Sequence, residues 1–427
     1  MSDKKREDYV NQPLSIYIHI PFCERKCNYC DFLSAPAGQE KQEQYVKALL
    51  GEIEYWGRRF ENVPVKSVFF GGGTPSILKP ELFVSLLCKL KEAFQGIVTC
   101  ENATDEIIQK QMLPDKSESR RNDLKSSQKQ TEISMELNPG TVTEEKLLAY
   151  KQAGINRLSI GLQSADNKEL KLLGRIHTYE QFLETYHMAR SCGFDNINID
   201  LISGLPGQKV SDWKEILKKV LALKPEHISA YSLIIEEGTP FFDTYNGKEE
   251  LLVDEETDRE MYALTKTMLK EAGYNRYEIS NYSKAGKECV HNIVYWQRGN
   301  YIGLGLGSSS MVDNVRFQNR TEFESYVNYW CEKCGNKKVD FPEVCQEIQP
   351  LTTEEQMEEF MFLGLRMMEG VSVAEFETLF EKSIFDVYGK LLETFESQKL
   401  LTVSDRIALT DKGIDVSNGV FAEFLLS

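Results

Sequence analysis

Pro21–Phe32 reads P-F-C-E-R-K-C-N-Y-C-D-F, with Cys23, Cys27 and Cys30 in the spacing C-x3-C-x2-C. The alternating run Ser15–Ile20, S-I-Y-I-H-I, precedes it and predicts a β-strand. Three thiolates at this spacing can hold three irons of a [4Fe-4S] cluster and leave the fourth iron without a cysteine ligand in this stretch. An open coordination position is where chemistry can occur, as it is at catalytic zinc.

Two other interpretations of these cysteines stay open at this level: three surface thiols, or part of a zinc knuckle, because a C-x2-C pair is common in both. The spacing and the preceding strand favour the cluster. Ten cysteines without a secretory signal favour reduced thiols and metal ligation over disulfides. A second group, Cys331, Cys334 and Cys345, has no evident fourth ligand, and we interpret these as free thiols.

Composition limits the class of protein. A chain of 427 residues with 41% hydrophobic and 11% aromatic residues can form one large domain and a smaller one. Residues 1–11 are charged and no apolar run reaches membrane-spanning length, so we expect a cytoplasmic protein without a transmembrane segment. A net charge of -16 repels phosphate backbones, which argues against a nucleic-acid partner.

Apolar runs of strand length alternate with helical patterns over the first half of the chain. This alternation predicts right-handed crossovers and a parallel sheet, and six such units fit an α/β fold of the partial (β/α)6 TIM-like barrel type. The expected strands are Ser15–Ile20, Val65–Phe70, Ile133–Leu137, Arg157–Leu162, Asn196–Ile202 and His227–Ile234. The expected helices are Gln42–Phe60, Glu81–Phe94, Glu144–Ala153, Tyr179–Cys192 and Ser211–Leu223. Glu101–Thr131 is polar and predicts a surface insertion.

Small and polar residues follow several of these strands. Functional groups of parallel α/β folds gather at the carboxyl ends of strands. Gly72, Gly73 and Thr74 end one strand, and glycines there allow backbone to approach a ligand closely. The polar residues at or near the ends of the other strands are Glu136, Gln163, Arg175 and Asp200. Taken singly, each of these four is more often a satisfied polar group at a strand end than a ligand contact.

The chain resembles the radical S-adenosylmethionine (SAM) superfamily, and within it the anaerobic coproporphyrinogen-III oxidase family. The motifs that carry this resemblance are the cysteine stretch, G-G-G-T-P, M-E-L-N-P, G-L-Q-S, L-G-R-I-H and I-D-L-I-S-G-L-P-G. In that superfamily the methionine group of SAM chelates the free iron. The resemblance implies that SAM is bound by Tyr17, Tyr29, Gly72, Gly73, Thr74, Glu136, Gln163, Arg175 and Asp200.

Three features separate two branches of this family, the oxidase and the HemW-type haem chaperones. The oxidase pattern has a fourth cysteine two positions after the third, where this chain has Phe32. The oxidase also has a long N-terminal arm, whereas only Met1–Leu14 precedes the first strand here. The third feature is H-N-I-V-Y-W, His291–Trp296, which resembles the H-N-x-x-Y-W element of the chaperones. The resemblance therefore favours the chaperone branch.

The chaperone resemblance implies that His291 contacts haem, supported by Asn292, Tyr295 and Trp296. An imidazole can ligate haem iron, and flanking aromatic rings offer flat apolar surface to a porphyrin. From the hexapeptide alone, a histidine that caps a turn beside core aromatics is the commoner case.

The pattern changes again near Pro350. Apolar residues recur at helical spacing over Ile384–Phe395, and Leu400–Thr410 predicts two short strands around a turn. This resembles the C-terminal winged-helix-like α+β domain of the same family. Residues 351–427 carry 6 Lys and Arg against 15 Asp and Glu, a net charge of -9, so we interpret the domain as a lid or partner surface rather than a DNA reader.

We therefore expect residues 1–240 to form the barrel, with the insertion at about 101–131, residues 241–349 an extension with the haem element, and residues 350–427 the C-terminal domain. The resemblance implies a haem chaperone that uses a [4Fe-4S] cluster and SAM and passes haem to haem-dependent respiratory proteins. Two other functions stay open: coproporphyrinogen oxidation and radical modification of another small molecule. A homodimer and peripheral contact with membrane-bound acceptors also stay open.

Overall fold

Parallel strands form the centre of the molecule in this computed structural model, which describes residues 12–98, 130–333 and 342–426. Within these residues one twelve-stranded sheet has the order β12-β11-β10-β9-β1-β2-β3-β4-β5-β6-β8-β7. The seven strands from β9 to β6 are mutually parallel, and antiparallel strands extend the sheet at both edges. The central strands are β1 (Leu14–Ile20), β2 (Val65–Gly72), β3 (Glu132–Leu137), β4 (Arg157–Gln163), β5 (Ile197–Ser203), β6 (His227–Ser232) and β9 (Asn300–Leu304).

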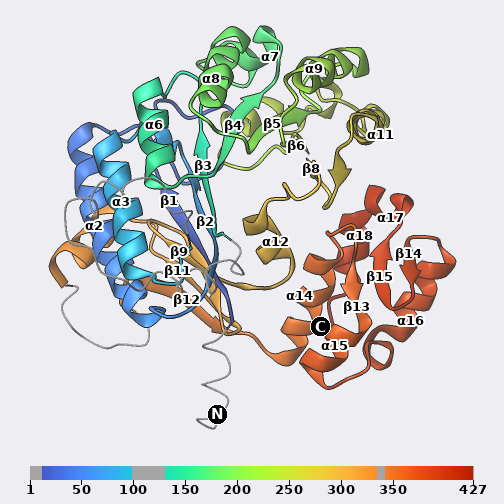
Figure 1. Cartoon of the computed structure of the whole chain (residues 1–427). Helices are drawn as coiled ribbons and strands as arrows, with labels where there is room; N and C mark the ends of the chain where they lie inside the picture. Colours follow the sequence, from blue (N-terminus) through green and yellow to red (C-terminus); the bar gives the residue numbers. More distant parts are fainter. Residues whose placement is uncertain (1–11, 99–129, 334–341, 427) are drawn as a thin grey trace, which may run out of the picture.

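Helices cover the outer face of this curved sheet (Figure 1). Those that precede β6 lie between two parallel strands in the sequence, as crossover connections require, and the last two follow β6. The helices of this half are α2 (Gln39–Arg59), α3 (Pro80–Ala93), α6 (Glu144–Ala153), α7 (Asn167–Leu172), α8 (Tyr179–Ser191), α9 (Val210–Leu223), α10 (Pro240–Tyr245) and α11 (Glu255–Glu271). No helix among the described residues is long and apolar enough to cross a membrane.

The expected partial barrel is confirmed, and its expected strands and helices agree with the observed ones within about three residues at each end. The main core is aliphatic and aromatic side chains between the sheet and the helices, such as Trp56 and Trp213, which are 2% and 0% exposed. The expected insertion lies, apart from its last two residues, outside the residues that the structure describes. Cys334 also lies outside them.

The strand β9 was not expected from the sequence. It pairs in parallel with β1, from Leu14 opposite Asn300 to Ile18 opposite Leu304. A strand from the second half of the chain therefore lies beside the first strand of the sheet. The remaining elements of this region are β7 (Asn275–Arg276), β8 (Asn281–Ser283), α12 (Val290–Trp296), β10 (Ser309–Val312), β11 (Val315–Asn319), α13 (Phe323–Asn328) and β12 (Cys345–Pro350).

A buried carboxylate holds this junction together. Glu52 of α2 is 0% exposed and accepts hydrogen bonds from Gly305 N (2.7 Å), Asn319 Nδ2 (2.6 Å) and Tyr326 OH (2.5 Å). These donors come from the end of β9, from β11 and from α13, so one side chain of α2 fixes three later segments. Burial raises the pKa of Glu52 to about 7, against the effect of its three donors.

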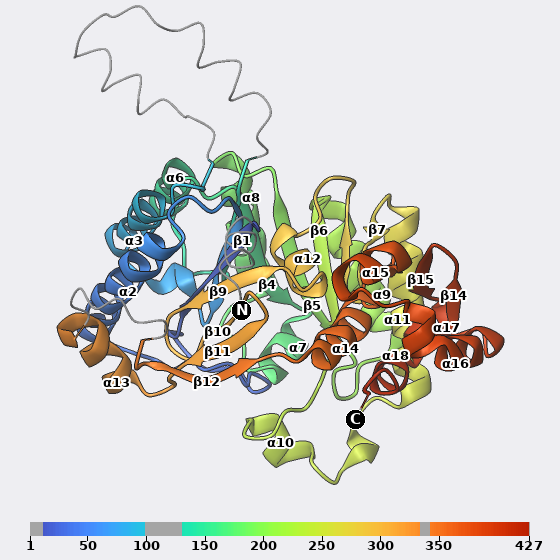
Figure 2. The same ribbon diagram turned by 90° about the horizontal axis from the view of Figure 1, so that it is seen from below.

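The C-terminal α+β domain has its own sheet, β13-β15-β14, and its own apolar core around Phe376 and Ile407. It lies beside α12, which is placed between this domain and the main sheet (Figure 2). Its elements are α14 (Thr353–Gly364), β13 (Val371–Ser372), α15 (Val373–Phe380), α16 (Ile384–Ser397), β14 (Leu401–Val403), β15 (Arg406–Leu409), α17 (Asp411–Asp415) and α18 (Ser417–Ala422). The expected helix and the two expected short strands are confirmed as α16, β14 and β15.

Candidate functional site

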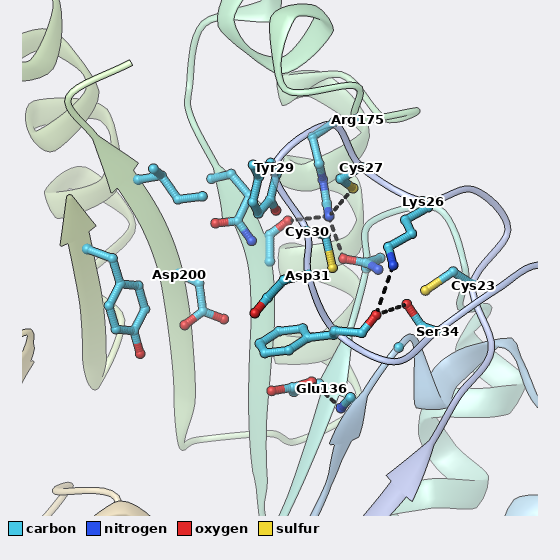
Figure 3. Close-up of a pocket in the computed structure, with 18 of the residues that line it drawn as sticks. Cys23, Lys26, Cys27, Tyr29, Cys30, Asp31, Ser34, Glu136, Arg175 and Asp200 are labelled. Carbon is cyan, nitrogen blue, oxygen red and sulfur yellow. Dashed lines mark hydrogen bonds between the residues drawn. The ribbon is translucent and has the colours of Figure 1, made fainter. Parts of the chain in front are cut away.

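A cavity of about 400 Å³ opens at the carboxyl ends of the parallel strands. We call it the outer cavity. The loop after β1 brings Cys23, Cys27 and Cys30 to its wall, and Asp200 lies across from this loop (Figure 3). The other residues expected to bind SAM that line it are Tyr29, Gly72, Gly73, Glu136, Gln163 and Arg175.

The three cysteines are suited to a cluster rather than to one ion. Among the described residues, no three His, Cys, Asp or Glu side chains converge on a single metal position. In a [4Fe-4S] cluster each thiolate binds a different iron, so the sulfurs need only face one volume. Two of them receive hydrogen bonds, from Thr74 Oγ1 to Cys23 Sγ (3.6 Å) and from Arg175 Nη1 to Cys27 Sγ (3.5 Å). Such donors stabilise thiolates.

Two glycines, Gly72 and Gly73, bring the end of β2 close to β1 and the residues that follow it, at the rim of this cavity. Gly72 has a φ of +104°, and a Cβ on it would lie 2.3 Å from the ring of His19. A Cβ on Gly73 would lie 2.5 Å from the carbonyl oxygen of Phe22 and 2.8 Å from that of Ile20. The glycines are therefore required first by the close approach of β1 and the start of the cysteine loop, which leaves no room for a Cβ. This is a different reason from the ligand approach that the sequence suggests.

Arg175 connects the cysteine loop to the strand ends. Its guanidinium also donates to Asn138 Oδ1 and to the carbonyl oxygen of Gly161 (2.8 Å). Its Nε is buried without a hydrogen-bond partner among the described residues. An arginine that is positioned by two strand ends and still has a free donor can take a carboxylate, such as that of SAM.

Gln163 is held in an unusual backbone conformation at the end of β4. Its φ is +70°, and the pairing of β4 with β5 shifts register between Gly161 and Gln163. Left-handed backbone at a residue other than glycine is costly and is concentrated at functional sites. The bulge directs the Gln163 side chain into the outer cavity.

A second cavity of about 220 Å³ adjoins the outer cavity and extends into the interior of the barrel. We call it the inner cavity. The two cavities have six lining residues in common: Phe32, Gly72, Glu136, Ser159, Asp200 and Tyr231. The inner cavity is also lined by Tyr17, Phe69, Arg157, Asn198, Ser229, Cys289, His291, Asn292 and Tyr295. Tyr17, expected to face SAM, therefore lies on the inner cavity, and Thr74 lies behind the cysteine loop.

The acidic groups between the two cavities are held by hydrogen bonds. Asp200 accepts from Ser159 Oγ (2.9 Å) and Asn198 Nδ2 (2.8 Å), and Glu136 accepts from Gly72 N (3.1 Å). Burial, with the nearby charge of Asp200 as the second cause, raises the pKa of Glu136 to about 8. Burial likewise raises the pKa of Asp200.

The H-N-x-x-Y-W element forms α12, and the structure separates its residues. Asn292 and Tyr295 face the inner cavity, whereas the Trp296 ring packs under Arg366 of the C-terminal domain, 4.4 Å from the guanidinium carbon. His291 is 1% exposed, with Nδ1 2.9 Å from Ser67 Oγ and Nε2 2.9 Å from Tyr295 OH. Burial lowers the pKa of His291 to about 3, so its ring is neutral. Both ring nitrogens are thus engaged within the protein.

Arg157, Ser159 and Asn198 line the cavities but were missed from the sequence, although their alternation with the predicted Gln163 and Asp200 could have indicated them. Arg157, Ser159, Gly161 and Gln163 are alternate residues of β4, and side chains two apart in a strand share a face. Asn198 with Asp200 on β5 follows the same spacing. Such polar alternation within apolar strands indicates a barrel with a polar interior.

The model of the radical SAM superfamily matches residues 17–220, and that of the HemN C-terminal domain matches residues 351–416. The haem chaperone HemW of Lactococcus lactis is 33% identical over 98% of both chains, and that of Bacillus subtilis is 33% identical over 96% of this chain and 99% of its own. The HemW of Escherichia coli is 36% identical over 70% of each.

Among solved structures, coproporphyrinogen III oxidase (HemN) of Escherichia coli, a radical SAM enzyme, superimposes with a TM-score of 0.77. The match covers 100% of this chain and 94% of that one at 22% sequence identity, which supports the fold alone. These matches confirm the resemblance to the radical SAM superfamily.

Proposed function

Because this chain belongs to the HemW family of radical SAM proteins, we propose that it is a haem chaperone, which binds haem and delivers it to haem-dependent proteins. The observation that carries this proposal is the identity of 33% to a haem chaperone over 98% of both chains. The phenylalanine at position 32, where the oxidase has a cysteine, is in keeping with it.

A [4Fe-4S] cluster and SAM are the cofactors of this family, and the residues of the outer cavity fit both. Cys23, Cys27 and Cys30 would hold the cluster, and Arg175 would take the carboxylate of SAM with its free Nε. We further propose contacts to SAM from Tyr29, Gly72, Gly73, Glu136, Gln163 and Asp200, with Tyr17 and Thr74 acting from just behind them. When bound, the cluster can supply an electron for cleavage of SAM.

For the haem, we propose a place at the open mouth of the outer cavity. Phe32, Tyr231 and Ile234 are 58%, 40% and 69% exposed there, and all three line the cavity. Large apolar side chains that gather on a surface indicate a binding site, and a porphyrin is a flat apolar partner. Neither cavity needs to enclose the macrocycle in this arrangement.

The H-N-x-x-Y-W element then has divided roles. We propose that Asn292 and Tyr295 act from the inner cavity, and that Trp296 couples α12 to the C-terminal domain. His291 would be a positioning residue in this state, because ligating iron requires its ring to leave Ser67 and Tyr295. The proposal also includes domain boundaries near residues 240 and 350 and a homodimer. The haem acceptors would be membrane-bound respiratory proteins, which this chain would meet from the cytoplasmic side.

An anaerobic comparison tests the function. The reconstituted protein would be titrated with haem and, separately, incubated with coproporphyrinogen III, SAM and a reductant. We expect stoichiometric haem uptake, transfer of that haem to an apo-cytochrome, and no porphyrinogen product. Conversion of coproporphyrinogen III at catalytic rates would overturn the chaperone function, and SAM cleavage without either result would favour another small-molecule substrate.

A further inference from the structure

The inner cavity contains a buried arginine, Arg157, whose Nε donor is left without a hydrogen-bond partner among the described residues, although the carboxylates of Glu132 and Asp200 act on its charge. Arg157 is 2% exposed and lines the cavity. A buried donor without a hydrogen bond is costly, so a guanidinium with an unsatisfied Nε at a cavity wall indicates that a ligand completes it.

The carboxylates nearest in the fold are already engaged elsewhere. Glu132 accepts hydrogen bonds from the backbone nitrogens of Val290 (3.2 Å) and His291 (3.3 Å), and so caps the start of α12. Asp200 accepts from Ser159 and Asn198. Burial raises the pKa of Glu136 to about 8, so this carboxyl is largely protonated at neutral pH and does not repel an anion. Arg157 thus keeps its Nε donor for the cavity.

The walls of the cavity are of two kinds. Ser159, Asn198 and Ser229 lie with Arg157 on its polar side. On the other side the rings of Tyr17 and Phe69 stack with their centroids 6.4 Å apart, and Phe69 stacks on His291 at 5.1 Å. An amphipathic ligand with one acidic end and an apolar body matches both sides.

We propose that the inner cavity is a ligand site for a carboxylate-bearing group, which Arg157 binds through its guanidinium while Tyr17 and Phe69 contact the apolar part of the ligand. The planar guanidinium fork matches a carboxylate. A cavity of about 150 Å³ holds benzene, so 220 Å³ accommodates on the order of nine non-hydrogen atoms. This excludes a porphyrin ring and admits an acidic side arm or a small acid.

Two sources can supply this carboxylate: a propionate arm of haem, or a free small carboxylic acid. The first rests on the proposed function, with the macrocycle at the cavity mouth, where Phe32 and Tyr231 border both cavities. The second does not depend on haem. The site itself is the same in both cases.

The first experiment compares benzoate with benzamide, which have the same size and differ in charge. Binding to the full-length protein is measured by calorimetry or ligand-observed NMR. We expect the wild type to bind benzoate at least about tenfold more tightly than benzamide, as a charge-assisted hydrogen bond implies. Arg157→Met abolishes this preference. Equal binding of the two compounds to the wild type, or a preference that survives in R157M, overturns the proposal.

Two further variants keep the test decisive. Arg190→Met removes a partly buried arginine that pairs with Glu226 outside both cavities (2.7 Å), and it is expected to keep the preference for benzoate. If R157M does not fold, Ser229→Leu keeps Arg157 and fills part of the cavity, so benzoate binding should fall at least about tenfold. Unchanged benzoate binding in S229L overturns the proposal.

The second experiment identifies the source by titrating haem and haem dimethyl ester. If haem supplies the carboxylate, the wild type binds haem more tightly than the ester, and R157M removes that difference. If a free acid is the ligand, haem binding is the same in R157M and only the benzoate preference is lost. A protein that binds no haem at all would overturn the chaperone function and leave the benzoate result standing.

Discussion

Replacing His291 by alanine should lower the stability of the protein and should not abolish haem binding. The imidazole is 1% exposed and lies within hydrogen-bonding distance of Ser67 Oγ and Tyr295 OH, both at 2.9 Å. It also stacks on Phe69, with ring centroids 5.1 Å apart. These contacts join α12 to β2, so the ring holds in place the helix that forms one wall of the inner cavity.

The magnitude follows from these contacts. Two hydrogen bonds contribute about 1 kcal/mol each, and truncation of a buried side chain of this size costs roughly 2 kcal/mol more. H291A should therefore lower the free energy of unfolding by about 4 kcal/mol, a large part of the 5 to 15 kcal/mol typical of natural proteins. Tyr295→Phe removes only one of the two hydrogen bonds and should cost about 1 kcal/mol.

Urea denaturation at pH 7.5, followed by circular dichroism, measures both losses. Asn292→Ala is the matched control: the residue is a neighbour on the same helix and faces the same cavity, and we expect a change within about 0.5 kcal/mol. Haem titrated into folded H291A should still bind. A variant as stable as the wild type, or one that is folded yet has lost haem binding, would refute the positioning role and favour direct ligation.

Three further predictions concern the outer cavity and the domain contact. Glu136→Gln should stabilise the SAM-free protein by up to about 2 kcal/mol more at pH 7.5 than at pH 5.5. The pKa of Glu136 is raised in the folded state, so as the pH rises above the unfolded value near 4.5 the carboxyl ionises readily only in the unfolded chain, and this costs the wild type stability. Denaturation at both pH values checks this, and equal effects would contradict it. Gly73→Ala should lower iron and sulfide content after reconstitution, since its Cβ would lie 2.5 Å from the Phe22 carbonyl oxygen and displace the cysteine loop; full cluster content would contradict this. Trp296→Ala should speed proteolytic release of the C-terminal domain without lowering cluster content, because it removes the ring under Arg366, and an unchanged cleavage rate would be the contrary result.

Much of the fold could be predicted from local patterns. Alternating apolar strands and helices of crossover length fix the order of β1 to β6, because each unit buries its apolar face only in that arrangement. The strand β9 was not predicted, since Asn300–Leu304 is only five residues long and contains a glycine, and its pairing with β1 depends on contacts between residues almost 300 positions apart. The hydrogen bonds of Glu52 to Gly305, Asn319 and Tyr326 could not be predicted either, because a glutamate in a helix gives no local sign that it will be buried.

For the site, the motifs indicated the outer cavity, and the long-range contacts defined the inner one. Glu136, Gln163 and Asp200 stand at strand ends, which meet at one edge of any parallel sheet. Arg157 stands at the start of its strand, and only the curvature of the barrel turns it inward toward the acidic and aromatic residues of neighbouring strands. The sequence also could not indicate that His291 is enclosed, because its two partners, Ser67 and Tyr295, come from β2 and from its own helix.

The sequence by itself indicated the family and the parallel barrel and led to the three cysteines that we propose as cluster ligands, because close spacing and regular periodicity are local properties that a chain carries before it folds. Only the tertiary structure decided which side chains of α12 face the inner cavity and which face the C-terminal domain, and that Arg157 is buried with an unsatisfied Nε donor. Burial and pairing are properties of neighbours, and those neighbours are brought together by sheet register and curvature, which no single segment encodes.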